Sequence, residues 1–289
     1  MIKNIGIIHD DIHPLLEKIA QRITAQGSAV KFIHYTALTF GFDTPDCFND
    51  LHAIYLDRMG ELTRSYSTQL ALLPTLQKFS GNIPIINDPL HYAVARNKAL
   101  SAQVLKIHGI PSPDTVTVYS LAQIDDLVGV QPHNKFVVKS ILGCCADDVY
   151  IYPDKINRAA IGTMLARDGM AIMQAFVERE NRFIWRVDIV DSKVIVCNQR
   201  FAYNAKDELP LCNGARGGDI VFLIPGDLPE PIYELAVVSV QTLGLVVAGV
   251  DIIEADNGQA FVIEVNPEPD ITLDKYELPN SIADYLVKL

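Results

Sequence analysis

The most constraining feature of the sequence is a hairpin pattern in the segment AGVDIIEADNGQAFVIEVNPEPD, which covers residues 248–270. Its dipeptide Asn257-Gly258 favours a tight turn, because a two-residue type I′ loop requires two residues that tolerate positive φ. With that loop, or with a symmetric four-residue loop, Asp251 lies directly opposite Glu264. Side chains alternate along a strand, so Asn266 shares the face of Glu264. The pattern therefore predicts two carboxylates and an amide on one face of an antiparallel hairpin.

The opposite face of this hairpin is expected to be apolar and to carry Val250, Ile252, Ile263 and Val265. Facing Cβ atoms on paired strands lie only about 5 Å apart, and like charges directly opposite one another are destabilising. A cation between the carboxylates would remove that repulsion. Asp251, Glu264 and Asn266 offer the hard oxygen ligands that Mg²⁺ prefers, with Mn²⁺ as a second candidate. The alternative is a solvated strand face on which the acids lie by chance.

The first 90 residues alternate strand and helix patterns. Apolar runs end near residues 8, 33, 56 and 86, and residues 12–23 and 70–79 have apolar side chains at helical spacing. This alternation predicts a parallel sheet covered on both faces. The segment His9–Pro14 stands where a dinucleotide-binding turn would need glycines, so this unit is not expected to hold a cofactor. From Thr115 onward strands outnumber helices, which indicates α+β units built on antiparallel sheets.

Charge and composition exclude several classes of protein. The chain has 24 Lys and Arg against 35 Asp and Glu, a net charge of −11, which argues against nucleic acid as the main partner. We find no signal-peptide pattern and no apolar stretch long enough to span a bilayer, so a soluble cytoplasmic protein without a membrane partner is expected. The five cysteines show no C-x-x-C spacing, which argues against a zinc knuckle or a disulfide framework.

Several basic residues are candidates for contacts with anions. Lys139 follows the apolar run 136–138 and points either into a cleft or into solvent at a strand end, whereas Lys98 by itself reads as a solvated helix lysine. Five arginines cluster in the acidic chain, at positions 179, 182, 186, 200 and 216. Several of them are expected to form surface ion pairs with Glu178, Glu180 and Asp188. Arg216 precedes Gly217-Gly218, where backbone can approach a ligand closely, and is the preferred candidate.

Taken together, these segments resemble the ATP-grasp superfamily and, within it, the RimK-like α-L-glutamate ligases. The resemblance covers essentially the whole chain. Arg58-Met59-Gly60 is similar to the family's R-x-G, residues 95–100 to its R-D-K-L helix, and Val137-Val138-Lys139 to the strand with the second ATP lysine. Residues 174–177 resemble its Q-E-Y-I linker. Arg186 and Arg200 match two family arginines, Asn213 and Arg216 match N-x-x-R-G-G, and residues 248–251 and 263–267 resemble the metal-binding motifs A-G-V-D and M-E-V-N.

The resemblance implies the ATP-grasp fold, α/β and α+β in class. An N-terminal parallel-sheet domain (1–90) would be followed by a central lobe (91–175) and a C-terminal lobe (176–289) that clamp the nucleotide between them. ATP would contact residues Lys98, Lys139, Gln174, Phe176, Val177, Glu178 and Arg186. The metal would be held by Asp251, Glu264 and Asn266. Catalysis is assigned to Arg216, Asn213 and Arg200, and substrate binding to Arg58.

The implied activity is an ATP-dependent carboxylate–amine ligase that works through an acyl phosphate. The amine would be L-glutamate or another amino acid, and the acceptor a small-molecule or protein carboxylate. Two alternatives stay open, namely a nucleotide-binding protein without catalysis and a ligase of another branch, such as the D-alanine–D-alanine or glutathione-synthetase-like enzymes. A homo-oligomer also stays open.

The sequence departs from the family in the loop that would cover the phosphates. The family pattern is G-x-x-G-x-G, whereas this chain has Gly143-Cys144-Cys145-Ala146-Asp147-Asp148. Unless the loop is displaced or a cation intervenes, repulsion from the two acids is expected to weaken ATP binding. The linker acid is replaced by Ala175, and Ile184 stands two residues before the strand arginine where an acid is usual. Glu178 or Glu180 would then have to supply the missing nucleotide contacts.

Overall fold

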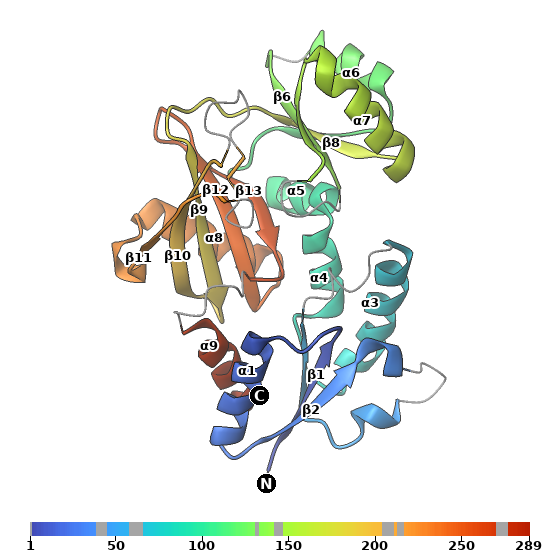
Figure 1. Ribbon diagram of the computed structural model, residues 1–289, viewed down its shortest axis with the longest axis vertical. Helices are drawn as coiled ribbons and strands as arrows, with labels where there is room; N and C mark the ends of the chain where they lie inside the picture. The colour runs from blue at the N-terminus through green and yellow to red at the C-terminus, as the bar shows by residue number, and fades with distance from the viewer. Residues whose placement is uncertain are drawn as a thin grey trace.

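The computed structural model describes residues 2–38, 45–57, 66–130, 133–141, 147–203, 211–212, 217–269 and 277–289. Three sheets dominate this part of the chain, each with its own helices (Figure 1). The arrangement has the mixed parallel and antiparallel sheets expected from the sequence. The predicted α/β and α+β classes are therefore confirmed.

The first sheet is parallel, as predicted, with strand order β2-β1-β3-β4. Its strands are β1 (Asn4–His9), β2 (Ala29–His34), β3 (Ala53–Leu56) and β4 (Ile85–Ile86). Helices α1 (Pro14–Ala25) and α3 (Tyr66–Ser80) pack on it, with short 3₁₀ helices η1 (Tyr35–Ala37) and η2 (Asp46–Phe48) in its connections. The apolar stripe of α1 is fully buried, which explains why that helix forms at this point of the chain.

The second sheet is antiparallel, with strand order β5-β8-β6-β7. It consists of β5 (Thr115–Val118), β6 (Phe136–Ser140), β7 (Val149–Tyr152) and β8 (Ala171–Ala175). Helices α6 (Leu121–Val128) and α7 (Lys155–Asp168) cover it and complete its core. Two further helices, α4 (Pro89–Arg96) and α5 (Lys98–Ile107), run from the first sheet toward this lobe (Figure 1).

The third sheet is also antiparallel, with strand order β11-β10-β9-β12-β13. Its strands are β9 (Phe183–Val190), β10 (Lys193–Phe201), β11 (Ile220–Leu223), β12 (Val247–Glu254) and β13 (Ala260–Asn266). Helix α8 (Glu230–Thr242) packs on one face, and the 3₁₀ helix η4 (Pro225–Asp227) precedes it. The last helix, α9 (Leu278–Lys288), packs against α1 and shares a core with the first sheet, although it lies within the range 176–289.

One buried side chain joins the first sheet to the third. Asn87 follows β4, and its Nδ2 donates to the carbonyl oxygens of Val247 at 2.7 Å and Pro267 at 3.1 Å. Its Oδ1 accepts from the backbone N–H groups of Val246 at 2.8 Å and Val247 at 2.9 Å. Four hydrogen bonds from a residue that is 2% exposed fix the start of β12 and the residue after Asn266 against the N-terminal unit.

The hairpin of β12 and β13 has the predicted pairing but a different turn. Ala255 N–H donates to the Gln259 carbonyl at 2.9 Å, so three residues form the loop, and only its last one, Gly258, has positive φ, at 81°. Near the turn Ile252 pairs with Val262, and a bulge then restores the pairing of Asp251 with Glu264. The prediction of a two-residue loop is therefore wrong. The opposed carboxylates are confirmed, because the extra loop residue shifts the pairing of the strands by one position and the bulge shifts it back.

The bulge also changes which side chains fill the core. Val250, Ile252 and Val265 are buried as predicted, but the fourth core position belongs to Val262. Ile263 is half-buried and lines a cavity instead. Among the residues that the structure describes, no helix has the length and apolar composition that crossing a membrane requires.

Candidate active site

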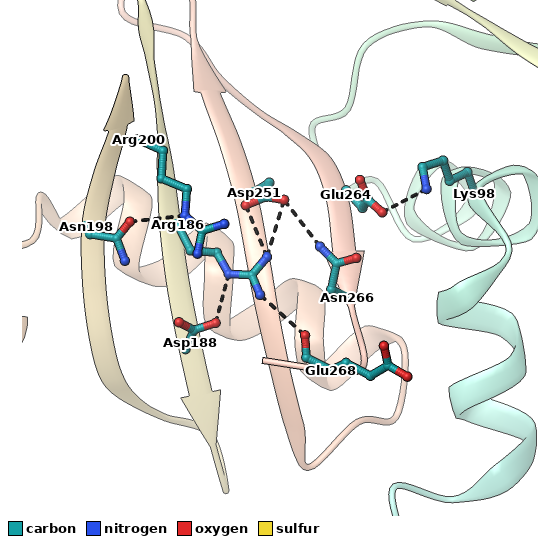
Figure 2. Close-up of polar contacts among 9 residues, drawn as sticks. All are labelled: Lys98, Arg186, Asp188, Asn198, Arg200, Asp251, Glu264, Asn266 and Glu268. Carbon is teal, nitrogen blue, oxygen red and sulfur yellow. Dashed lines mark hydrogen bonds and ion pairs between the residues drawn. The ribbon is translucent and has the colours of Figure 1, made fainter. Parts of the chain in front are cut away.

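A row of polar side chains crosses four neighbouring strands of the third sheet. Asn198 on β10 pairs with Arg186 on β9, Arg186 pairs with Asp251 on β12, and Asp251 pairs with Glu264 on β13. Because directly paired residues of adjacent strands point to the same face, these four side chains form one layer (Figure 2). Asn266 pairs with Gly249 on the next rung, and its Nδ2 donates to Asp251 Oδ2 at 3.3 Å.

The guanidinium of Arg186 lies at the centre of this layer. Its Nε donates to Asp188 Oδ1 at 2.8 Å, its Nη1 lies 3.3 Å from both carboxylate oxygens of Asp251, and its Nη2 donates to the Glu268 carbonyl at 3.4 Å. The side chains of Arg186 and Asp188 are 4% and 0% exposed. The expectation that Asp188 takes part in a surface ion pair is therefore wrong. The signal was present in the sequence, since Arg186 and Asp188 lie two residues apart in an otherwise apolar strand.

The second carboxylate of the row is held from another lobe. Lys98 Nζ lies 2.9 Å from Glu264 Oε1, with the two side chains 11% and 27% exposed. Lys98 is the first residue of α5, where Asn97 caps the helix by accepting from the N–H groups of Ala99 and Leu100. Its own N–H donates to the Ile141 carbonyl at 3.0 Å. The interpretation of Lys98 as a solvated helix lysine is thus wrong.

Lys139 approaches the same carboxylates from β6. Its Nζ donates to Gln174 Oε1 at 2.9 Å, and Gln174 Nε2 donates to Thr115 Oγ1 at 3.0 Å. Burial lowers the pKa of Lys139 to about 8, and Glu264 opposes that shift. Burial alone would raise the pKa of Glu264, but Lys98 and Lys139 outweigh it and hold the pKa below its usual value. Lys139 is therefore no solvated strand end.

These groups border a cavity between the lobes. The space between its atoms, counted together with space open to solvent, is about 340 Å³. Its lining includes Ala95, Lys98, Ser101, Ala102, Leu105, Ser112, Ile172, Gln174, Val262, Ile263 and Glu264. Residues of α5, β8 and β13 thus surround one space, and the structure brings the predicted Lys98, Gln174 and Glu264 together there.

The segment that follows β8 joins the second and third sheets. The backbone N–H of Phe176 donates to the Lys135 carbonyl at 3.1 Å, and Lys135 Nζ lies 4.4 Å from the centroid of the Phe176 ring. Val177 is half-buried and Glu178 is exposed. Gln174 is buried in β8, where its side chain, rather than its main chain alone, contacts the site.

Arg200 and Asp148 each contact polar side chains of their own lobes. Arg200 Nε donates to Asn198 Oδ1 at 3.3 Å, so Arg200 continues the polar layer along β10. The carboxylate of Asp148 accepts from Tyr150 at 3.0 Å and from Arg167 Nη2 at 2.7 Å. Arg167 also pairs with Asp168 at 2.6 Å, so one guanidinium is shared between the two carboxylates. Arg58, Asn213, Arg216 and residues 143–146 lie outside the described part of the chain.

The donor set fits a hard divalent cation whose coordination a second molecule completes. Within the described ranges, no group of three or more His, Cys, Asp or Glu side chains could hold a metal alone. Asp251 and Glu264 contribute carboxylate oxygens on adjacent strands, and Asn266 adds an amide beside them. Mg²⁺ is usually bound by one or two carboxylates together with phosphate oxygens of a substrate, and this set matches that pattern.

Comparisons with known proteins agree with this geometry. Residues 95–288 match the model of the RimK-like ATP-grasp domain. The tetrahydromethanopterin:α-L-glutamate ligase of Methanocaldococcus jannaschii is 30% identical over 215 residues, which are 71% of this chain and 69% of that protein. The crystal structure of a RimK domain ATP-grasp protein from Sphaerobacter thermophilus superposes with a TM-score of 0.72 at 17% identity, covering 98% of this chain and 99% of the other.

A second structural relative was solved with ligands. The RiPP-associated ATP-grasp ligase of Chryseobacterium gregarium, in complex with ADP and a leader and core peptide, has a TM-score of 0.72 at 16% identity over 99% of this chain and 97% of its own. The match of the family model over most of the chain decides the assignment. This chain belongs to the RimK-like ATP-grasp family and is an ATP-dependent carboxylate–amine ligase.

Proposed function

We propose that the protein joins the amine of L-glutamate, or of another amino acid, to an acceptor carboxylate through an acyl phosphate. The observation that carries this proposal is the meeting of two opposed carboxylates with lysines from two other elements. Asp251 and Glu264 lie side by side, and Lys98 and Lys139 approach them from α5 and β6. Such an alternation of negative and positive groups suits a triphosphate with its divalent cation.

Without a ligand, Lys98 forms an ion pair with Glu264, and ATP with its cation would replace that pair. Lys98 and Lys139 would hold phosphate oxygens, while Asp251, Glu264 and Asn266 would hold Mg²⁺ or Mn²⁺. When bound, the cation supplies neutralisation of phosphate charge. The segment Gln174–Glu178 would border the adenine, since it connects the two lobes beside Lys139. The pairing of Asp148 with Arg167, which is shared with Asp168, would lessen the repulsion from Asp148.

The proposed reaction has two steps. An oxygen of the acceptor carboxylate attacks the γ-phosphorus, and the bond to the leaving oxygen of ADP breaks. The neutral amine then attacks the acyl carbon, phosphate leaves with the electron pair of its C–O bond, and the amine loses a proton. Arg186, Arg200 and Arg216, with Asn213, would stabilise the negative charge that develops, and Arg58 would contact an acidic substrate.

The acceptor class is the least defined part of this proposal. The relatives are named as a tetrahydromethanopterin ligase and as a ligase bound to a peptide, so a coenzyme and a peptide carboxylate both belong in the test. We would measure ADP release for twenty amino acids paired with pterin, deazaflavin and peptide carboxylates, and identify products by mass spectrometry. A product whose mass shows amide formation supports the proposal. ATP binding without ADP release across the whole panel would favour a binding protein instead.

A further inference from the structure

Asp188 has no role in the proposed reaction, yet its carboxylate is completely buried on the row of the sheet that also holds Gly249 and Asn266. Its side chain is 0% exposed, and Oδ1 accepts from Arg186 Nε at 2.8 Å. Burying a carboxylate is costly unless a cation matches it. Here the matching cation is the central guanidinium of the polar layer (Figure 2).

The backbone is shaped to hold this pair. Gly249 lies opposite Asp188 on β12, two residues before Asp251. A Cβ atom at position 249 would overlap Nη2 and Cζ of Arg186 and Oδ1 of Asp188. The guanidinium therefore lies directly over the Gly249 backbone, with Asp188 on its Nε side and Asp251 on its Nη1 side.

The charges around Arg186 show what Asp188 changes. Arg186 contacts two carboxylates, and the one that is also a proposed metal ligand is the more distant, at 3.3 Å against 2.8 Å. If Arg186 is balanced by Asp188, then Asp251 and Glu264 keep two negative charges for a divalent cation. Without the charge of Asp188, Arg186 would neutralise Asp251, and a cation at that carboxylate would be repelled.

We propose that Asp188 is a positioning residue that retains Arg186 over Gly249 and so leaves Asp251 available to the divalent cation. This inference rests on the proposed metal site and assigns to the same site a residue that does not itself touch metal or phosphate. It predicts that Asp188 controls metal affinity through Arg186 rather than through the fold. Removing both partners together should then reverse part of the effect of removing Asp188 alone.

The test measures Mn²⁺ binding to the full chain saturated with AMP-PNP, from the EPR signal of free Mn²⁺, with the analogue alone as blank. Asp188→Asn keeps an oxygen that accepts from Arg186 but removes the charge, and we expect it to weaken Mn²⁺ binding about tenfold or more. The double variant Arg186→Gln/Asp188→Asn should bind Mn²⁺ more tightly than Asp188→Asn alone, because it also removes the unmatched charge of Arg186. The control Asp284→Asn removes an ion pair with Arg22 between α1 and α9, far from the site, and should change nothing.

The outcomes separate this inference from the proposed metal site. Wild-type protein that binds no Mn²⁺ beyond the blank would contradict the metal site itself. Wild-type binding that Asp188→Asn leaves unchanged, or a double variant as weak as the single one, would overturn the role of Asp188. If Asp188→Asn does not fold, judged by circular dichroism, the double variant and Gly249→Ala decide. Gly249→Ala must bind Mn²⁺ more weakly than wild type, because its Cβ displaces the guanidinium, and the double variant must bind more tightly than Gly249→Ala.

Discussion

Replacing Asn87 by alanine should strongly destabilise the protein, because this side chain makes the four hydrogen bonds that join the first and third sheets. At a net value of about 1 kcal/mol for each bond, the free energy of unfolding should fall by ~4 kcal/mol. The backbone groups of Val247 and Pro267 would lose partners in buried surroundings, which places the effect above that of a typical single substitution.

Urea unfolding followed by circular dichroism measures this loss as a lower transition midpoint. Asn157→Ala is a matched control, because Asn157 Nδ2 makes a single hydrogen bond, to the Ile151 carbonyl at 3.1 Å. That control should lose only about 1 kcal/mol. Asn87→Ala should also raise KM for ATP, since Asn87 fixes the chain directly after Asn266. Equal losses for the two variants would refute the reasoning that Asn87 acts as a fourfold connection.

Three further predictions concern the site. Glu264→Gln should reduce ADP release at least about 100-fold while the urea midpoint stays within the error of the wild type, and unchanged turnover would contradict the metal assignment. Lys139 has its pKa lowered to about 8, so it carries its charge below that pH and loses it above. The kcat/KM for ATP should therefore fall as pH rises through ~8, and Lys139→Arg should abolish this step in a pH profile. Arg167→Ala should raise KM for ATP several-fold by leaving the charge of Asp148 unmatched, and adding Asp148→Gly should reverse it; a persistent defect would mean that Arg167 acts otherwise.

Some features of the site follow from the sequence because they are local. The two carboxylates of the hairpin lie 13 positions apart around one turn, so strand alternation and the turn signal suffice to oppose them. Even here the turn was predicted with one residue too few, and the bulge beside Asp251 compensated for it. The alternation of side chains predicts which face of a strand a residue occupies, but it does not predict a bulge. Here the bulge places Val262 rather than Ile263 in the core.

Other features depend on contacts between distant segments. Sequence pattern placed Lys98 on a helix and Glu264 on a strand, but only the packing of α5 beside β13 makes them an ion pair. Likewise Asn87 and Val247 meet although 160 positions separate them.

The class of each sheet and the opposed carboxylates follow from the sequence, because they depend on local patterns within strands, hairpins and helices, whereas helix α6 and the break between α4 and α5 were not predicted. The burial of Asp188 against Arg186, and the space that Gly249 leaves for the guanidinium, arise from the packing of strands that are distant in sequence. The physical reason is that a charge in a sequence has no burial and no partner until sheets are assembled. The energy of a carboxylate depends on both.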